Sequence, residues 1–187
     1  IESLSKQMFN FSSSLDTYPN YIIERFDLSD KNDKLLSVGE DFASILNVVA
    51  STKYDIEMQS IARTLKEIST NWDGDRNVLL RHLVVNMLVG NNDFHAKNIS
   101  LLKTYNSETK EIVTCELSPA YDIVCMEPSL LGMKNLIGSH GMYLHGKRDF
   151  SLETLMEYAK SSLEFTEDEA LKIISDACSK GLKFASS

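Results

Sequence analysis

A chain of 187 residues and 21.1 kDa is long enough for one ordinary domain, which at this size buries roughly 70% of its unfolded surface. Its formal net charge of -8 argues against a general attraction to nucleic acid or to an anionic membrane. The cysteines Cys115, Cys125 and Cys178 are widely spaced and form no C-x-x-C pair, which argues against a disulfide framework or a zinc site. The sequence shows no export signal and no apolar run near the roughly 18 residues of a membrane span, so we expect a cytoplasmic protein, with delivery into another cell left open.

The composition is even along the chain, without a repeat or a low-complexity linker, which favours a single domain over 1–187. The beginning of the chain is ambiguous and predicts at most a short helix over 4–9. Residues 21–27 predict a strand, because an apolar and aromatic run stands there between Pro19 and the polar stretch 29–34.

Helical patterns dominate the next part of the chain and indicate an α+β fold made mostly of helices. Apolar residues at helical spacing predict helices over 40–49 and 56–68. The segment 78–89 is apolar at nearly every position, so we expect a helix that is buried on most sides. It is expected to end at Gly90, a typical C′ residue.

A small hairpin and two more helices are predicted in the last part of the chain. The strands of the hairpin are expected over 99–102 and 111–117, with Pro119 ending the second strand. The two helices have clear starts, since Ser151 is a candidate N-cap for one and residues 166–169 form a capping box for the other.

The most informative segment is residues 90–99, Gly-Asn-Asn-Asp-Phe-His-Ala-Lys-Asn-Ile, which stands between two apolar segments. It contains Asp93-x-His95-x-x-Asn98, an acid and an amide five positions apart. In phosphoryl-transfer loops, the Asp accepts the proton of the acceptor hydroxyl, and an Asn five residues later holds a magnesium ion on the nucleotide. A short loop with this spacing can aim both side chains at one phosphoryl group.

Asp122, in the run Ala-Tyr-Asp-Ile-Val after the expected hairpin, is the third member of the candidate site. Because the hairpin returns the chain to the loop, we expect Asn98 and Asp122 to ligate Mg²⁺, which prefers one or two protein oxygens together with substrate phosphates. Asp93 is the candidate base, a role worth on the order of 10² to 10⁴ in rate. His95 is expected to contact phosphate or to order the loop, and Lys97 to neutralise charge on the transferred group. The expected cofactors are therefore ATP and Mg²⁺.

Each of these assignments has a structural alternative. An Asn-Asn-Asp run after a helix and its glycine is also a common turn composition, which would account for Asp93 and Asn98 together. Asp122 alone is also explained as the cap of a turn. A structural role for His95 and a solvated position for Lys97 stay open as well.

Residues 90–100 resemble the catalytic loop of HipA-like toxin kinases, and residues 117–123, Leu-Ser-Pro-Ala-Tyr-Asp-Ile, resemble the metal-binding segment of that family. The resemblance spans about residues 20–180. Three weaker matches stand in the family's order: 23–27 with its hinge strand, 39–42 and 53–54 with the start of its core helical region, and 141–147 followed by 152–159 with its C-terminal part.

This resemblance implies a serine/threonine protein kinase with a mostly helical C-lobe, of the type that forms the toxin of bacterial toxin–antitoxin modules and favours persistence. It implies that the backbone of Glu24 and Phe26 meets the adenine of ATP and that Asp27 lies near the ribose, while His95 and Asn98 complete the nucleotide site. The expected partners are a protein substrate, such as an aminoacyl-tRNA synthetase, and an antitoxin protein. Direct binding to nucleic acid or to a membrane is not expected.

The chain departs from the family pattern at its N-terminus. Nothing before residue 20 supplies a Gly- or Ser-rich phosphate loop or a strand lysine, so 1–27 is interpreted as the end of the N-lobe with the hinge strand, and 28–187 as the helical lobe. A lone C-lobe should be nearly inactive, because phosphoryl transfer relies almost wholly on positioning and charge stabilisation. The absence of an initial Met favours a truncated kinase, with a separate N-lobe polypeptide as the alternative.

Three other functions stay open at this point. The pattern D-x-H-x-x-N also resembles the loop of phosphoinositide kinases, which allows a lipid or small-molecule kinase, although the acidic charge counts against it. A pseudokinase or interaction module fits a gene without an N-lobe, but it has no need of Asp93, Asn98 and Asp122 together. A metal-dependent hydrolase built on Asp93, His95 and Asp122 would bind metal tightly without nucleotide.

Overall fold

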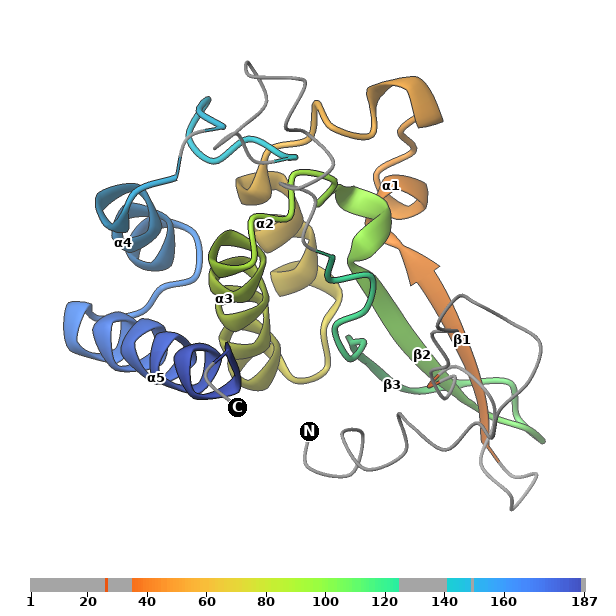
Figure 1. Cartoon of the computed structure of the whole chain (residues 1–187). Coiled ribbons are helices and arrows are strands. Elements are labelled where there is room, and N and C mark those ends of the chain that lie inside the picture. Colours follow the sequence, from red (N-terminus) through yellow and green to blue (C-terminus); the bar gives the residue numbers. More distant parts are fainter. Residues whose placement is uncertain (1–25, 27–34, 125–140, 149, 186–187) are drawn as a thin grey trace, which may run out of the picture.

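The structure is a computed structural model, and it describes residues 26, 35–124, 141–148 and 150–185 (Figure 1). The helix predicted over 4–9 and the strand predicted over 21–27 lie outside the described residues, apart from Phe26.

The described residues form an α+β fold with a three-stranded antiparallel sheet beside a group of helices, which confirms the predicted fold class. In chain order, the elements are β1 (Leu35–Asp41), α1 (Phe42–Ile45), η1 (Ala50–Thr52), α2 (Met58–Ile68), α3 (Trp72–Leu88), η2 (Ala96–Asn98), β2 (Ser100–Asn106), β3 (Ile112–Leu117), α4 (Leu152–Ser161) and α5 (Glu167–Ala185), where η marks a 3-10 helix.

The sheet has the order β1-β2-β3, so β2 is its central strand. β2 begins two residues after η2, and its first residue, Ser100, pairs with Asp41 at the end of β1. The chain leaves β1 directly into α1, where the amide of Phe42 donates to the carbonyl of Ile99 over 2.9 Å. The sheet therefore fixes the end of the loop that carries the candidate site.

The helices bury their apolar sides in one core. α3 lies between α2 and α5 and contributes the buried residues Leu79, Leu80 and Leu83 (Figure 1). Each such side chain stabilises the fold by about 1.5 to 3 kcal/mol on transfer from water. The helix predicted over 78–89 begins earlier in the structure, at Trp72. The side chain of Asn71 caps this start by accepting from the amide of Gly74. The first turns of α3 lie partly in solvent, so they lack the apolar pattern on which the prediction depended.

One further predicted helix is wrong in length, and one strand was not predicted. The helix expected over 40–49 ends at Ile45, since Asp41 caps α1 and Asn47 adopts a left-handed φ of 54°. β1 was not predicted at all, because Leu35–Asp41 contains a glycine and two acids in place of an apolar alternation. The hairpin is confirmed, although β2 continues to Asn106, four residues beyond its predicted end at residue 102.

Both C-terminal helix starts are confirmed. The hydroxyl of Ser151 accepts from the amide of Thr154 over 3.2 Å at the start of α4. Before α5, the amide of Thr166 donates to the carboxylate of Glu169 over 2.8 Å, and the amide of Glu169 donates back to the Thr166 hydroxyl over 3.3 Å. Among the helices of the described ranges, none is both long enough and apolar enough to cross a membrane.

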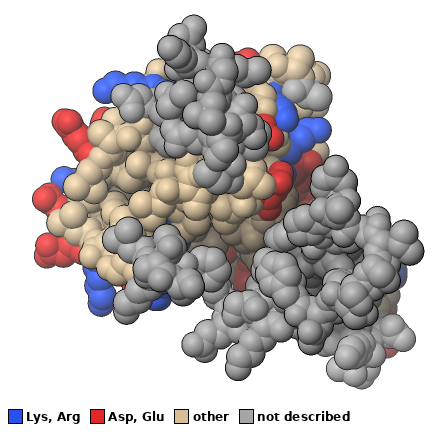
Figure 2. Space-filling view, in the orientation of Figure 1, with Lys and Arg blue, Asp and Glu red and all other residues tan. Residues whose placement is uncertain are grey.

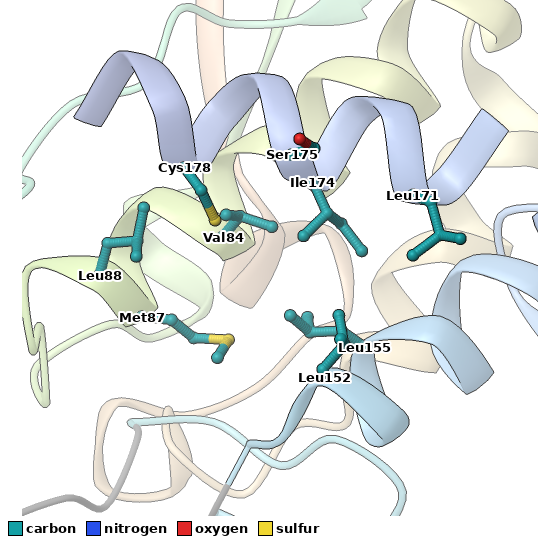
Figure 3. A pocket seen from close by; sticks show the side chains of 9 residues that line it. All are labelled: Val84, Met87, Leu88, Leu152, Leu155, Leu171, Ile174, Ser175 and Cys178. Atoms are coloured by element: carbon teal, nitrogen blue, oxygen red, sulfur yellow. The ribbon is translucent and has the colours of Figure 1, made fainter. Parts of the chain in front are cut away.

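A cavity of about 390 Å³ lies between α3, α4 and α5 (Figure 3). Its lining is apolar apart from Ser175 and Cys178, and it includes Met87, Leu155 and Ile174. Figure 2 shows charged side chains mainly around the rim of this face of the molecule, with a broad uncharged area across its middle. Among the described residues that line the cavity, the thiol of Cys178 is the one ionisable group, and the candidate site lies elsewhere.

Candidate functional site

The candidate site begins where α3 ends. Gly90 adopts a φ of 65°, and its amide donates to the carbonyl of Met87 over 3.1 Å, so it is the C′ residue that the sequence predicted. A residue with a Cβ atom is strained in this conformation, which explains a glycine here. The chain then leaves the helix axis and runs through residues 91–95 into η2.

Asp93 lies in this loop with 40% of its side chain exposed. Its Oδ1 atom accepts a hydrogen bond from the hydroxyl of Tyr54. The same oxygen lies 3.9 Å from the ammonium of Lys53 and 3.8 Å from Nε2 of His95. The carboxylate is thus held through one oxygen while much of the group faces solvent, as a base that must reach a bound substrate requires.

His95 is buried beneath Asp93, and its ring meets the ring of Tyr54 edge to face with the centroids 5.3 Å apart. Burial, together with the positive charge of Lys53, lowers the pKa of His95 below its ordinary value. At neutral pH the ring is therefore neutral, so it orders the loop and offers hydrogen bonds in place of a fixed charge. Lys97 lies on the exposed side of η2, and its backbone carbonyl accepts from the hydroxyl of Tyr121.

The structure brings Asn98 and Asp122 together from the two ends of the hairpin. Asn98 is 2% exposed, and its amide oxygen accepts from the amide of His95 over 2.8 Å. Its amide nitrogen donates to Oδ2 of Asp122 over 2.6 Å. Asp122 is exposed and has a left-handed φ of 55°, a conformation that costs a non-glycine residue on the order of 1 kcal/mol. The bond to Asn98 is one of the contacts that hold this strained residue.

Two buried amides that the sequence did not assign connect both parts of the site. Asn91 is 1% exposed, and its amide nitrogen donates to Oδ1 of Asn86 over 2.6 Å and to the carbonyl of Asp122 over 3.2 Å. Its amide oxygen accepts from the amide of Asp93 over 3.2 Å. Asn86 in turn donates to the carbonyl of His82 on α3 over 2.8 Å. The signal in the sequence was Asn86 itself, one of the few polar residues in the largely apolar segment 78–89.

Lys53 and Tyr54 are also functional candidates, and the sequence did not reveal that they lie at the site. Burial first, and then the hydrogen bond to Asp93, raises the pKa of Tyr54 to about 12. The backbone carbonyl of Tyr54 accepts from the guanidinium of Arg148 over 3.3 Å. Because Tyr54 and Asp93 are 39 positions apart, no local spacing reveals their contact.

On the side where the nucleotide base is expected, Glu24 and Asp27 lie outside the described residues. Phe26 is described, and its ring lies against the ring of Tyr121 with the centroids 5.7 Å apart. It is therefore adjacent to the segment that carries Asp122. The contact of Phe26 with adenine stays a prediction.

The chemistry of the donors at Asn98 and Asp122 fits a magnesium ion. Their side chains carry an amide oxygen and a carboxylate, and Mg²⁺ is usually bound by one or two such protein oxygens plus substrate phosphates. In this structure the amide nitrogen of Asn98 faces Asp122, while its oxygen accepts from the amide of His95, so binding of the metal by both residues would require the Asn98 side chain to turn. In the part of the chain that the structure describes, no group of three or more His, Cys, Asp and Glu residues could hold a metal ion. The geometry of these residues therefore gives no support to a hydrolase with a metal held by Asp93, His95 and Asp122, and a metal site carried by the hairpin stays a prediction.

The fold is that of a HipA-like protein. The structure matches a chain of the Shewanella oneidensis MR-1 toxin–antitoxin system HipA, HipB and its operator DNA complex, with a TM-score of 0.58 and 16% sequence identity over 85% of this chain. The match spans 41% of that solved chain.

The family follows from the sequence comparison. Residues 4–183 match the HipA-like C-terminal domain, so the chain belongs to this family and the resemblance seen in its motifs is confirmed. A curated relative, "Putative kinase Y4dM" of Sinorhizobium fredii (strain NBRC 101917 / NGR234), is 37% identical over 112 residues. Those residues are 59% of this chain and 24% of the relative, so the chain spans about a quarter of that protein.

Proposed function

We propose that this chain is the catalytic C-lobe of a serine/threonine protein kinase that transfers the γ-phosphate of ATP to a protein hydroxyl. Its membership of the HipA-like family and a relative named as a kinase support this reaction class. We further propose that the kinase is the toxin of a bacterial toxin–antitoxin module, bound by an antitoxin, because its structural neighbour belongs to such a system. An aminoacyl-tRNA synthetase is the proposed kind of substrate.

The observation that carries the proposal is the arrangement of Asp93, Asn98 and Asp122. The partly exposed carboxylate of Asp93 lies five residues before the buried amide of Asn98, which is bonded to the exposed carboxylate of Asp122. This arrangement supports a phosphoryl-transfer site in which the acceptor side, at Asp93, adjoins the metal side, at Asn98 and Asp122. If these residues only capped turns, the carboxylates of Asp93 and Asp122 would not both need to reach solvent beside the buried amide of Asn98.

Each residue then has a defined task. Asp93 accepts the proton of the attacking hydroxyl, and the neutral ring of His95 supports the loop beneath it. Asn98 and Asp122 would hold Mg²⁺, which when bound supplies positive charge to the β and γ phosphates of ATP. The residues between these groups keep the two tasks at a fixed separation, because Asn91 is bonded to the backbone beside both carboxylates.

The test is magnesium-dependent transfer from labelled ATP by the full gene product, with a cell lysate as the pool of substrates. We expect Asp93→Asn to lower the transfer by about 10² to 10⁴, the usual worth of a general base. The matched control is Asp168→Asn, which changes an exposed aspartate in the first turn of α5 and should keep normal transfer. Equal labelling by the wild type and Asp93→Asn would contradict the proposal, and nucleotide binding without transfer would instead indicate a pseudokinase module.

A further inference from the structure

Two neighbouring residues between η1 and α2 converge on the same oxygen of the proposed base. The hydroxyl of Tyr54 donates to Oδ1 of Asp93, and the ammonium of Lys53 lies 3.9 Å from that atom. Among the lysines that the structure describes, Lys53 is the one that pairs with Asp93, whereas Lys97 lies exposed on η2.

This turn is fixed in place by contacts on several sides. Arg148 donates to the carbonyl of Tyr54 over 3.3 Å and pairs with Asp55 over 3.5 Å. The ammonium of Lys53 lies 4.8 Å from the centroid of the Tyr54 ring, within the range of a cation–π contact, and only 26% of the lysine side chain is exposed. The edge-to-face contact between Tyr54 and His95 ties the turn to the catalytic loop. The convergence on Asp93 is therefore built into the fold.

We propose that Tyr54 positions Asp93 and that Lys53 is a catalytic residue that contacts the phosphoryl group during transfer. This inference rests on the proposed kinase function and adds to it the residues of the acceptor side. Tyr54 donates to Oδ1, and the side-chain hydrogen bonds and ion pairs among the described residues involve Oδ1 and not Oδ2, so we assign Oδ2 of Asp93 to the acceptor hydroxyl. Because the raised pKa of Tyr54 is about 12, its hydroxyl keeps its proton and remains a donor at physiological pH.

The distances allow Lys53 to reach the transferred group. An acceptor oxygen bonded to Oδ2 of Asp93 would lie about 2.6 to 3.2 Å from it, and a reacting phosphorus about 3 to 3.5 Å further on. The ammonium of Lys53, 3.9 Å from Oδ1, stands on a flexible four-carbon stem and can contact the equatorial oxygens of that phosphoryl group.

The chemical step balances with these roles. The acceptor oxygen forms a bond to the γ-phosphorus while the bond from that phosphorus to the β–γ bridging oxygen breaks, so ADP leaves with the bonding electron pair. The acceptor proton passes to Oδ2 of Asp93. Lys53 stays protonated throughout and balances the negative charge that spreads over the equatorial oxygens.

The experiment compares Lys53→Met, Lys53→Arg and Tyr54→Phe in the full gene product. We expect Lys53→Met to lower kcat by about 10² to 10³, as loss of one preorganised donor to a transition-state charge does. Lys53→Arg keeps the charge and should restore kcat to within about tenfold of the wild type. Tyr54→Phe keeps the ring and loses the hydroxyl, so kcat should fall about tenfold. In each of the three variants, KM for ATP should change less than about threefold.

Two matched variants control for removal of a lysine and of a phenol. Lys66→Met changes a lysine of α2 that pairs with Glu164, and Tyr105→Phe changes a tyrosine near the far end of β2. Both should keep wild-type turnover. If the controls lose as much turnover as Lys53→Met and Tyr54→Phe, the inference is overturned, because the loss then follows from removing any lysine or phenol.

Binding measurements give a second readout that does not depend on turnover. We expect Lys53→Met to bind Mg·ADP like the wild type but to bind Mg·ADP with aluminium fluoride about 10²-fold more weakly, because that complex resembles the transition state. Normal affinity for both complexes would overturn the role of Lys53. If Asp93→Asn is inactive while Lys53→Met and Tyr54→Phe turn over normally, this inference alone fails; if Asp93→Asn is also fully active, the proposed function fails with it.

Discussion

The two halves of the candidate site are held in different ways. In the base half, Asp93 is bound by the side chains of Tyr54 and Lys53, which come from a turn far away in the sequence. In the metal half, Asn98 and Asp122 are joined directly, and buried amides bind the backbone around them. The metal half is thus assembled when α3, the loop and the hairpin fold, whereas the base half also depends on the docking of a second segment.

The largest effect is expected from breaking the buried amide that joins the halves. Asn91→Leu leaves Oδ1 of Asn86, the carbonyl of Asp122 and the amide of Asp93 without their partner. Because a buried unpaired group costs about 1 to 3 kcal/mol, we expect a loss of about 3 to 5 kcal/mol in the free energy of unfolding, measured with urea.

The control for this variant is Asn77→Leu on α3, where the amide oxygen accepts a single bond from Arg81 at a partly exposed position. It should change the free energy of unfolding by less than about 1.5 kcal/mol. A loss of similar size in both variants would show that Asn91 has no special part in joining the halves.

A second prediction concerns pH and the residue beneath the base half. His82 is 5% exposed and lies edge to face with Phe94, the neighbour of Asp93, at 5.1 Å between ring centroids. Burial lowers the pKa of His82 to about 4, so the unfolded chain takes up this proton near pH 6.5 while the folded chain does not until near pH 4. Stability is therefore full above pH 6.5 and falls as the pH drops toward 4, by about 3 kcal/mol.

Urea unfolding at pH 7 and pH 4.5 measures this loss in the wild type and in His82→Gln, which has no ionisable group at that position. On going from pH 7 to pH 4.5, the wild type should lose more of its free energy of unfolding than His82→Gln does. If both lose the same stability on acidification, other groups cause the loss.

Gly141 packs against the backbone of Phe94, next to Asp93 in the base half. A Cβ atom at this position would lie 2.0 Å from the carbonyl oxygen of Phe94, which is a backbone atom of the candidate loop. We expect Gly141→Ala to displace the loop, to cost about 1 to 3 kcal/mol and to lower phosphoryl transfer while nucleotide binding is kept.

Gly146→Ala tests whether that effect comes from the contact. A Cβ atom there meets nothing within 4 Å, although the φ of 71° still makes the change unfavourable by about 1 kcal/mol. Gly146→Ala should leave phosphoryl transfer unchanged. If it lowers transfer as much as Gly141→Ala does, the effect comes from disturbing the segment as a whole and not from the contact with Phe94.

The smallest effect is expected far from both halves. Thr166→Ala removes the hydroxyl that accepts from the amide of Glu169 before α5, which should cost about 1 kcal/mol in thermal unfolding. Phosphoryl transfer at moderate temperature should stay as in the wild type. A change in transfer would mean that α5 is coupled to the site.

The metal half was the more predictable part from sequence, because its geometry depends on local order. Gly90 ends α3, the loop follows at once, and the hairpin returns Asp122 to Asn98, so the spacing of a few residues carries the information. The helix starts at Ser151 and Thr166 were predictable for the same reason, since a cap is recognised within four residues.

The base half was less predictable, because it depends on contacts between distant segments. The pair Tyr54 and Asp93 is fixed by the docking of a turn, and nothing within a short window reports it. β1 was missed on similar grounds, since Leu35–Asp41 becomes a strand by pairing with β2, whose residues lie 59 to 71 positions later. Helical spacing after residue 40 was misleading because Asn47 ends that helix with a positive φ.

The most direct test of the two-half account is calorimetric binding of Mg·ATP to the full gene product carrying Asp93→Asn or Asp122→Asn. We expect Asp122→Asn to weaken the affinity at least about tenfold, since it removes the charged ligand that we propose for the metal. We expect Asp93→Asn to keep the affinity within about threefold of the wild type, although transfer is lost. Equal affinities in the two variants, or normal binding by Asp122→Asn, would contradict the division of the site into a base half and a metal half.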